Sequence, residues 1–157
     1  MTQHTLHAFT DDALGTDDAT ALAERLRRGE ISAAIAAEAA ITRLQRVNPT
    51  LNGLVLNTYA EARERANNKH FEGFFAGVPS LIKDNIDLRG LPTGHGSAAV
   101  GSKPMKKTSV LAKQYLAQGF NLLRKTTLPA FGFTASTEMA HAPPTRNPWH
   151  LHPPARG

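Results

Sequence analysis

The chain has 157 residues, 41% of them hydrophobic and 20% charged, a composition that fits one globular domain and excludes disordered and collagen-like chains. It contains no cysteine, which excludes disulfides, thiolate metal sites and a cysteine nucleophile. The formal net charge of +5 raises the question of nucleic acid, but the seven Lys and Arg residues of the acid-free stretch 88–137 are dispersed, so nucleic acid is not expected to be the main partner.

Two helices are predicted in the first third of the chain. Asp17 and Asp18 precede a segment that ends in arginines and Gly29, the usual punctuation of a helix. Ser32 opens a second helix, and Asn48-Pro49 is expected to end it. The apolar residues of the second helix share one face: Ala37, Ala40, Ile41, Leu44 and Val47.

Predicted strands and helices alternate from residue 54 onward, which indicates an α/β fold with a parallel or mixed sheet. On the first of these helices, Glu61 and Arg65 are spaced to form an i, i+4 ion pair. The predicted elements are a strand at 54–57, a helix at 59–67, a strand at 80–86, a glycine-rich loop at 90–101, a helix at 109–118 and a strand at 120–125.

The last part of the chain is rich in proline, with five of the ten prolines in the final seventeen residues. Because proline lacks a backbone donor, we expect an irregular or disordered tail after about Thr134. His141, His150 and His152 in this tail are interpreted as solvated, since no third metal ligand has a defined position. No metal or other cofactor is expected.

No apolar run reaches the roughly 18 residues of a membrane-spanning helix. Residues 1–10 contain neither a basic leader nor an apolar stretch, so a secretory signal peptide is not expected. We therefore expect a cytoplasmic protein without a membrane partner, while no pattern in the sequence indicates its oligomeric state.

The spacing Ser80-x-x-Lys83 formally matches the S-x-x-K pattern of penicillin-recognising serine enzymes. That chemistry needs both residues on one face of a helix, whereas the predicted strand places them on opposite faces. The K-T-G partner motif is also missing, because Lys125-Thr126-Thr127 lacks the glycine. We therefore reject this interpretation.

Lys83 itself is a second candidate. In an extended strand it shares a face with Leu81 and Asn85, so the adjacent Asp84 is not its natural ion-pair partner. A lysine that enters a buried face without a carboxylate loses its proton readily and then serves as a base, because desolvation disfavours the charged form. The spacing alone also allows a lysine that extends to the surface.

Several ordered motifs together resemble the amidase signature family of amide hydrolases over about residues 9–151. The resemblance implies the N-terminal helices and part of the mixed α/β sheet of that fold, which would be incomplete. It divides the chain into an N-terminal part of an amidase domain at 1–151 and a divergent tail at 152–157. The motifs are Phe9–Gly15, Gly77–Ile86, Thr93–Ser97, Arg124–Gly132 and Thr145–Trp149.

The resemblance implies a Ser, cis-Ser, Lys triad that hydrolyses small-molecule amides to an acid and ammonia or an amine, without a cofactor. A neutral lysine deprotonates the nucleophilic serine through a bridging serine, and backbone N–H groups of a glycine-rich turn hold the oxyanion. Lys83 occupies the position of that lysine.

The sequence departs from the family pattern after Leu151. A Gly-Gly-Ser-Ser-Gly-Gly run with the bridging serine is expected there, but the chain reads His152-Pro153-Pro154 and ends at Gly157. A shifted reading frame or a premature stop would account for this change. We therefore expect the chain to carry the base but neither triad serine, and to be inactive alone. None of its six serines lies in a motif that matches either triad serine: Ser32, Ser80, Ser97, Ser102, Ser109 and Ser136.

Smaller departures lie nearer the lysine, where Thr127 and Ala130 stand at positions at which the family often has Asn and Glu. Two alternatives stay open. The first is a non-catalytic interaction or binding fragment, whose exposed sheet edges and apolar surface would seek a partner. The second is a fragment of a tRNA-linked amidotransferase subunit. The stretch Leu128–Gly132 looks more like a free-standing amidase.

Overall fold

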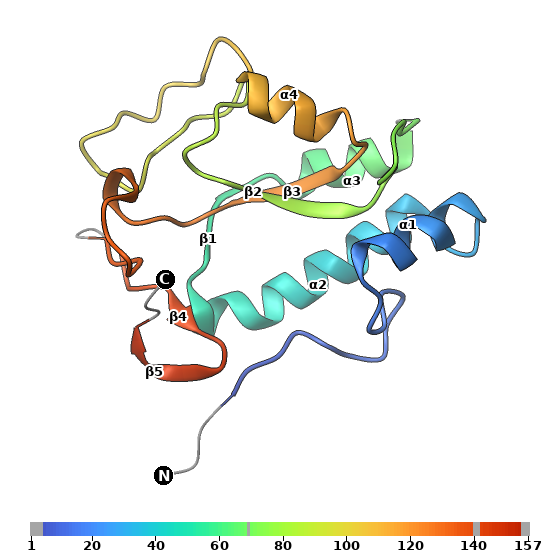
Figure 1. Cartoon of the computed structure of the whole chain (residues 1–157), viewed down its shortest axis with the longest axis horizontal. Helices are drawn as coiled ribbons and strands as arrows, with labels where there is room; N and C mark the ends of the chain where they lie inside the picture. The colour runs from blue at the N-terminus through green and yellow to red at the C-terminus, as the bar shows by residue number, and fades with distance from the viewer. Residues whose placement is uncertain (1–4, 69, 140–141, 155–157) are drawn as a thin grey trace.

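A three-stranded mixed sheet forms the centre of the computed structural model, which describes residues 5–68, 70–139 and 142–154 (Figure 1). The strand order is β1-β3-β2. Strand β3 (Asn121–Thr126) runs antiparallel to β1 (Leu54–Asn57) and parallel to β2 (Pro79–Lys83). The predicted α/β fold with a mixed sheet is confirmed.

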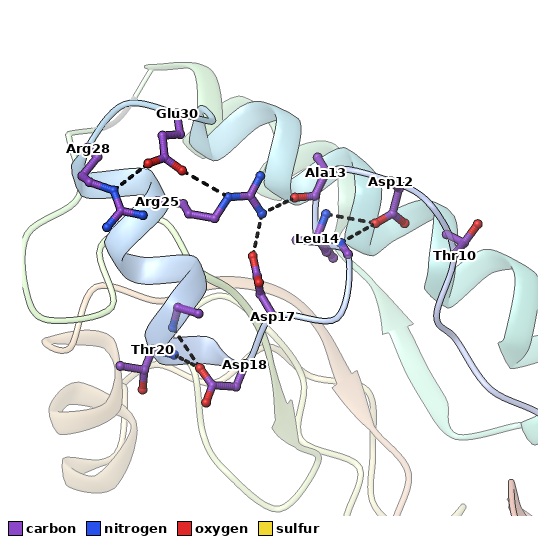
Figure 2. Close-up of polar contacts among 12 residues, drawn as sticks. Thr10, Asp12, Ala13, Leu14, Asp17, Asp18, Thr20, Arg25, Arg28 and Glu30 are labelled. Carbon is purple, nitrogen blue, oxygen red and sulfur yellow. Dashed lines mark hydrogen bonds and ion pairs between the residues drawn. The ribbon is translucent and has the colours of Figure 1, made fainter.

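Helix α1 (Ala19–Arg27) begins where the paired aspartates predict it. The Asp18 carboxylate accepts hydrogen bonds from the backbone N–H groups of Thr20 and Ala21, at 2.9 and 2.8 Å (Figure 2). Those N–H groups lack partners within the helix, so the aspartate side chain stabilises its first turn.

Helix α2 (Ala33–Leu51) continues beyond Asn48-Pro49, so the predicted end of this helix is wrong. The proline lies in the last turn of the helix, where it removes one backbone donor, and two more helical residues follow it. Asn52 then ends the helix in the left-handed conformation and donates its N–H to the Asn48 carbonyl at 2.7 Å. The Asn48 side chain accepts the N–H of Gly53, which holds the turn that follows.

Different helices bury the two faces of the sheet (Figure 1). Leu123 packs against α2 and α3 (Tyr59–Asn68), whereas its neighbour Leu122 packs against α4 (Val110–Leu116). In the described part of the chain, no helix combines the length and the apolar character needed to cross a bilayer. Buried with Leu123 are Ala37, Ile41, Tyr59 and Ala62, and buried with Leu122 are Ile82, Leu88 and Ala112.

Strand β3 contains a bulge where it pairs with β2. Ser80 pairs with Leu122, but the next residue of β2 pairs with Arg124, so one residue of β3 is left over. An extra residue switches the faces of the side chains that follow it. Lys125 therefore points to the same side as Leu122, toward the glycine-rich loop.

The side chain just before α3 and one within that helix cover part of the β3 edge. Strand β1 pairs with residues 124–126, and the described structure has no strand beside the first half of β3 on that side. The Thr58 hydroxyl donates to the Leu123 carbonyl at 2.6 Å, and the Arg65 guanidinium donates to the Leu122 carbonyl. These carbonyls are satisfied without a neighbouring strand.

Arg65 does not form the predicted ion pair with Glu61, although both residues are described. Its guanidinium turns toward the sheet, where carbonyl acceptors need a donor. Burial lowers the pKa of Arg65, and the carboxylates of Glu61 and Glu64 oppose that shift.

The prediction of an irregular tail after Thr134 is wrong in part, because β4 (Arg146–Asn147) and β5 (His150–Pro154) form an antiparallel hairpin. The Asn147 carboxamide accepts the Trp149 N–H at 2.9 Å and closes the turn. A two-stranded ribbon has two edges, and edge strands tolerate proline because alternate N–H groups need no partner. The predicted division at 151/152 falls within β5, and it stays a prediction.

Candidate active site

The parallel strands β2 and β3 end side by side, with Lys83 paired to Thr126. In open α/β sheets, functional groups gather at this edge, in the loops that follow the carboxyl ends of the strands. The Asp84 N–H donates to the Thr126 carbonyl at 3.1 Å, and the chain then turns as the Ile86 N–H donates to the Lys83 carbonyl. The strand therefore ends at Lys83, not at residue 86 as predicted.

Lys83 is exposed, so of the two placements that the spacing allows, the structure has the one in which the lysine extends to the surface. The lysine is the last residue of β2, which lies at an edge of the sheet, and its side chain leaves the sheet at an open corner.

Asp84 forms a buried ion pair with Lys125. The Lys125 ammonium is 2.8 Å from Asp84 Oδ1, and its side chain is 1% exposed. It also donates to the Pro92 carbonyl at 2.8 Å and to the Thr93 hydroxyl at 3.1 Å, which occupies all three of its donors. Asp84 Oδ2 accepts the Gly94 N–H at 3.0 Å. The Asp84 carboxylate thus binds Lys125 and the Gly94 N–H, and it does not pair with the preceding Lys83, as the strand alternation predicts.

A chain of backbone hydrogen bonds fixes the glycine-rich loop next to this pair. The His95 N–H donates to the Asp84 carbonyl at 3.1 Å, and the Phe131 N–H donates to the His95 carbonyl at 2.8 Å. Gly96 has a φ of +66°, and a Cβ there would lie 2.3 Å from the Leu128 carbonyl oxygen. Only glycine allows the backbone of the loop to come this close to the backbone after β3. The two segments therefore pack directly against each other at Gly96.

Aromatic side chains are exposed beside this loop. Phe131, in the short η1 turn (Ala130–Gly132), is 50% exposed and Phe133 is 85% exposed. The ring centroids of His95 and Phe131 are 6.2 Å apart, and those of Phe131 and Phe133 are 6.1 Å apart. The corner that contains Lys83 therefore adjoins apolar surface that water contacts in this chain.

The other sequence candidates are not part of this corner. The Ser80 hydroxyl is hydrogen-bonded to the Tyr115 hydroxyl on the α4 side of the sheet, which supports the rejection of the S-x-x-K interpretation. Of the tail histidines, His141 lies outside the described residues, as does the side chain of His152. Within the described residues, no group of three His, Asp or Glu side chains is placed to hold a metal ion.

Lys125 and Thr93 are the site residues that sequence reasoning missed. Lys125 lies two positions after the apolar Leu123, and a lysine there was a signal for a buried charged partner. Alternation along β3 would place Lys125 on the face opposite Leu122. The bulge reverses that placement, and it has no mark in the sequence.

A family model described as amidase matches residues 36–154, a range that contains Lys83, Asp84 and Lys125. The AmiC protein of Mycobacterium leprae (strain TN) is 47% identical over 144 residues, which cover 92% of this chain and 31% of that protein. The chain thus spans less than a third of the length of this relative.

Solved structures resemble the fold of the chain. The structure of 6-aminohexanoate cyclic dimer hydrolase complexed with substrate has a TM-score of 0.79 and 35% identity, over 86% of this chain and 28% of that one. A bacterial aryl acylamidase of the amidase signature enzymes has a TM-score of 0.77 and 29% identity, over 90% of this chain and 31% of that one.

Proposed function

Because the chain belongs to the amidase family, we propose that it supplies the lysine side of an amide-hydrolysing site, with Lys83 as the base. The observation that carries this proposal is the separation of Lys83 from Asp84. The acid is paired with Lys125 on the α4 side of the sheet, and among the described residues no carboxylate forms an ion pair with Lys83. A base must accept a proton, and a carboxylate partner would favour the protonated amine.

The proposed reaction follows the triad that the sequence resemblance implies. The neutral Lys83 amine takes the proton of a bridging serine, which takes the proton of the nucleophilic serine. The nucleophile adds to the amide carbonyl, the C–N bond breaks as the leaving amine regains a proton, and water then hydrolyses the acyl-enzyme ester. This chain contributes the amine and the backbone framework that directs it, namely the end of β2 and the loop tied to Asp84.

We propose that polypeptide beyond the matched region supplies the two serines and covers Lys83. A cover over Lys83 would remove water from the base, and burial disfavours the charged form of an amine. The exposed Phe131 and Phe133 beside the loop are suited to such a cover, because burying them is favourable. It follows that the 157 residues alone do not hydrolyse amides.

A chimera tests this proposal. Residues 1–151 replace the matching part of the Mycobacterium leprae AmiC protein, and hydrolysis of p-nitroacetanilide is followed. The chimera is expected to be active, and Lys83→Ala to lower kcat about 1000-fold, since a positioned base contributes on that order. Lys103→Ala, which alters another exposed lysine, is the control and should leave the rate unchanged.

The same assay on the 157-residue chain should give no rate above the blank, with or without Lys83→Ala. An active chimera that is insensitive to Lys83→Ala would overturn the assignment of the base. Lysine-dependent turnover by the 157-residue chain alone would contradict the need for serines from outside it.

A further inference from the structure

Four cations of the acid-free stretch lie around one hollow on the α4 side of the molecule. The hollow has a volume of about 580 Å³, and its lining includes Leu116, the last residue of α4, and Ala117, which caps that helix. No acidic side chain is among the described residues that line it. The four cations are Arg89, Lys106, Lys107 and Lys113, all exposed.

These cations differ from the arginines near the N-terminus, which are paired with acids (Figure 2). Arg25 lies 2.6 Å from Asp17, and Arg28 lies 2.6 Å from Glu30. Within the described residues, none of the four cations around the hollow has an ion-pair partner. No carboxylate within the described residues therefore competes with an added anion for these four charges.

Backbone hydrogen bonds hold the segments that carry these cations together. The Gly90 N–H donates to the Met105 carbonyl at 2.9 Å, and the Met105 N–H donates to the Leu91 carbonyl at 3.0 Å. The Arg89 N–H donates to the Thr108 hydroxyl oxygen at 3.0 Å. The four charges are thus brought together by the fold before any ligand is present, which lowers the entropic cost of binding one.

Thr108 adds a neutral donor to the site. Its hydroxyl oxygen accepts from the Arg89 backbone, so the orientation of its O–H stays available for an acceptor in the hollow. The arginine fork binds phosphate oxygens in pairs, and lysine ammonium groups bind them as point charges. Together, the donors suit an anion with several oxygens and several negative charges.

We propose that this hollow binds a compact oligophosphate, of the kind found in inorganic tripolyphosphate or in the triphosphate group of a nucleotide. Four cations match the charge of such a group, and the hollow confines them to one place. A nucleic-acid strand would need cations along a longer track, whereas the remaining basic residues of 88–137 are dispersed. The proposal concerns a surface away from Lys83 and does not depend on amide hydrolysis.

Titration of the 157-residue chain with inorganic tripolyphosphate in low salt, followed by calorimetry, tests the proposal. Binding is expected with a sub-millimolar Kd that weakens as NaCl is added, because salt screens exposed charges. The double variant Lys106→Gln/Lys107→Gln should weaken binding about tenfold, since each exposed charge contributes modestly. Lys103→Gln removes a charge from the same stretch but outside the hollow, and should change Kd less than about twofold.

Far-UV circular dichroism of each variant checks that the fold is kept, as is expected for exposed lysines. ATP is the second probe, and should compete with tripolyphosphate for the same site. A short oligouridylate tests whether the hollow prefers a nucleic-acid strand to a compact oligophosphate. Absence of tripolyphosphate binding, equal weakening by Lys103→Gln, or oligouridylate binding that tripolyphosphate does not displace would each overturn the proposal.

Discussion

The N-terminal region and the carboxyl end of the sheet both contain acid–base pairs at short distance, but the pairs differ in exposure. Arg25 and Asp17 lie 2.6 Å apart, and their side chains are 28% and 29% exposed. Lys125 and Asp84 lie 2.8 Å apart, and theirs are 1% and 11% exposed. Water screens the first pair and not the second, so similar distances have unequal consequences for stability.

The largest effect is expected from breaking the buried pair. Lys125→Met leaves the Asp84 carboxylate buried without its cation, and should lower the free energy of unfolding by about 3–5 kcal/mol. Urea denaturation measures this. Lys125→Met/Asp84→Asn removes both charges and should recover part of the loss. A loss below about 1 kcal/mol in the single variant would show that water reaches the pair.

The second effect compares two glycines with left-handed backbone. Gly96 at the carboxyl end of the sheet has φ +66° and a crowded Cβ position, whereas Gly15 near the N-terminus has φ +51° and open space around it. Gly96→Ala should therefore lower the free energy of unfolding by about 2–3 kcal/mol, and Gly15→Ala by about 1 kcal/mol. Thermal unfolding of both variants checks this order, and equal losses would mean that the loop moves away from Leu128.

The smallest effect is expected from the exposed pair. Asp17→Asn should change the free energy of unfolding by less than about 1 kcal/mol, because the pair is partly solvated and Arg25 keeps its hydrogen bond to the Ala13 carbonyl. Urea denaturation in low salt and in 1 M NaCl measures this. The difference in the free energy of unfolding between the Asp17→Asn variant and the unchanged chain should be smaller in 1 M NaCl, where the Debye length is about 3 Å. A larger loss of unfolding free energy that does not change with salt would mean that the Arg25–Asp17 pair is as poorly screened by water as the Lys125–Asp84 pair.

The sequence predicted most elements because their signals are local. Asp18 and Ser32 cap the first two helices by their own side chains, and the apolar runs at 54–57 and 120–125 match strands closely. The C-terminal hairpin was missed because its two residue pairs, Arg146 with Pro154 and Asn147 with His150, depend on the Asn147 turn more than on strand propensity.

The site was predictable in position but not in environment. The motif around Lys83 placed the lysine in a strand, although that strand was expected to continue to residue 86, and alternation separated the lysine from Asp84. Its exposure depends on which segments cover the sheet corner, and the partner of Asp84 depends on the bulge in β3. Both are long-range properties, and residue spacing describes only short-range ones.

The capped half of the β3 edge limits how this sheet grows. Thr58 and Arg65 occupy the carbonyls that an added strand would need there, which also protects the chain from pairing with other copies at this edge. Strand β2 has its other edge open in the described structure. A strand that extends the sheet next to β2 would therefore lie beside the end of β2 at Lys83. Under the proposed function, extending the sheet would then also help to complete the site.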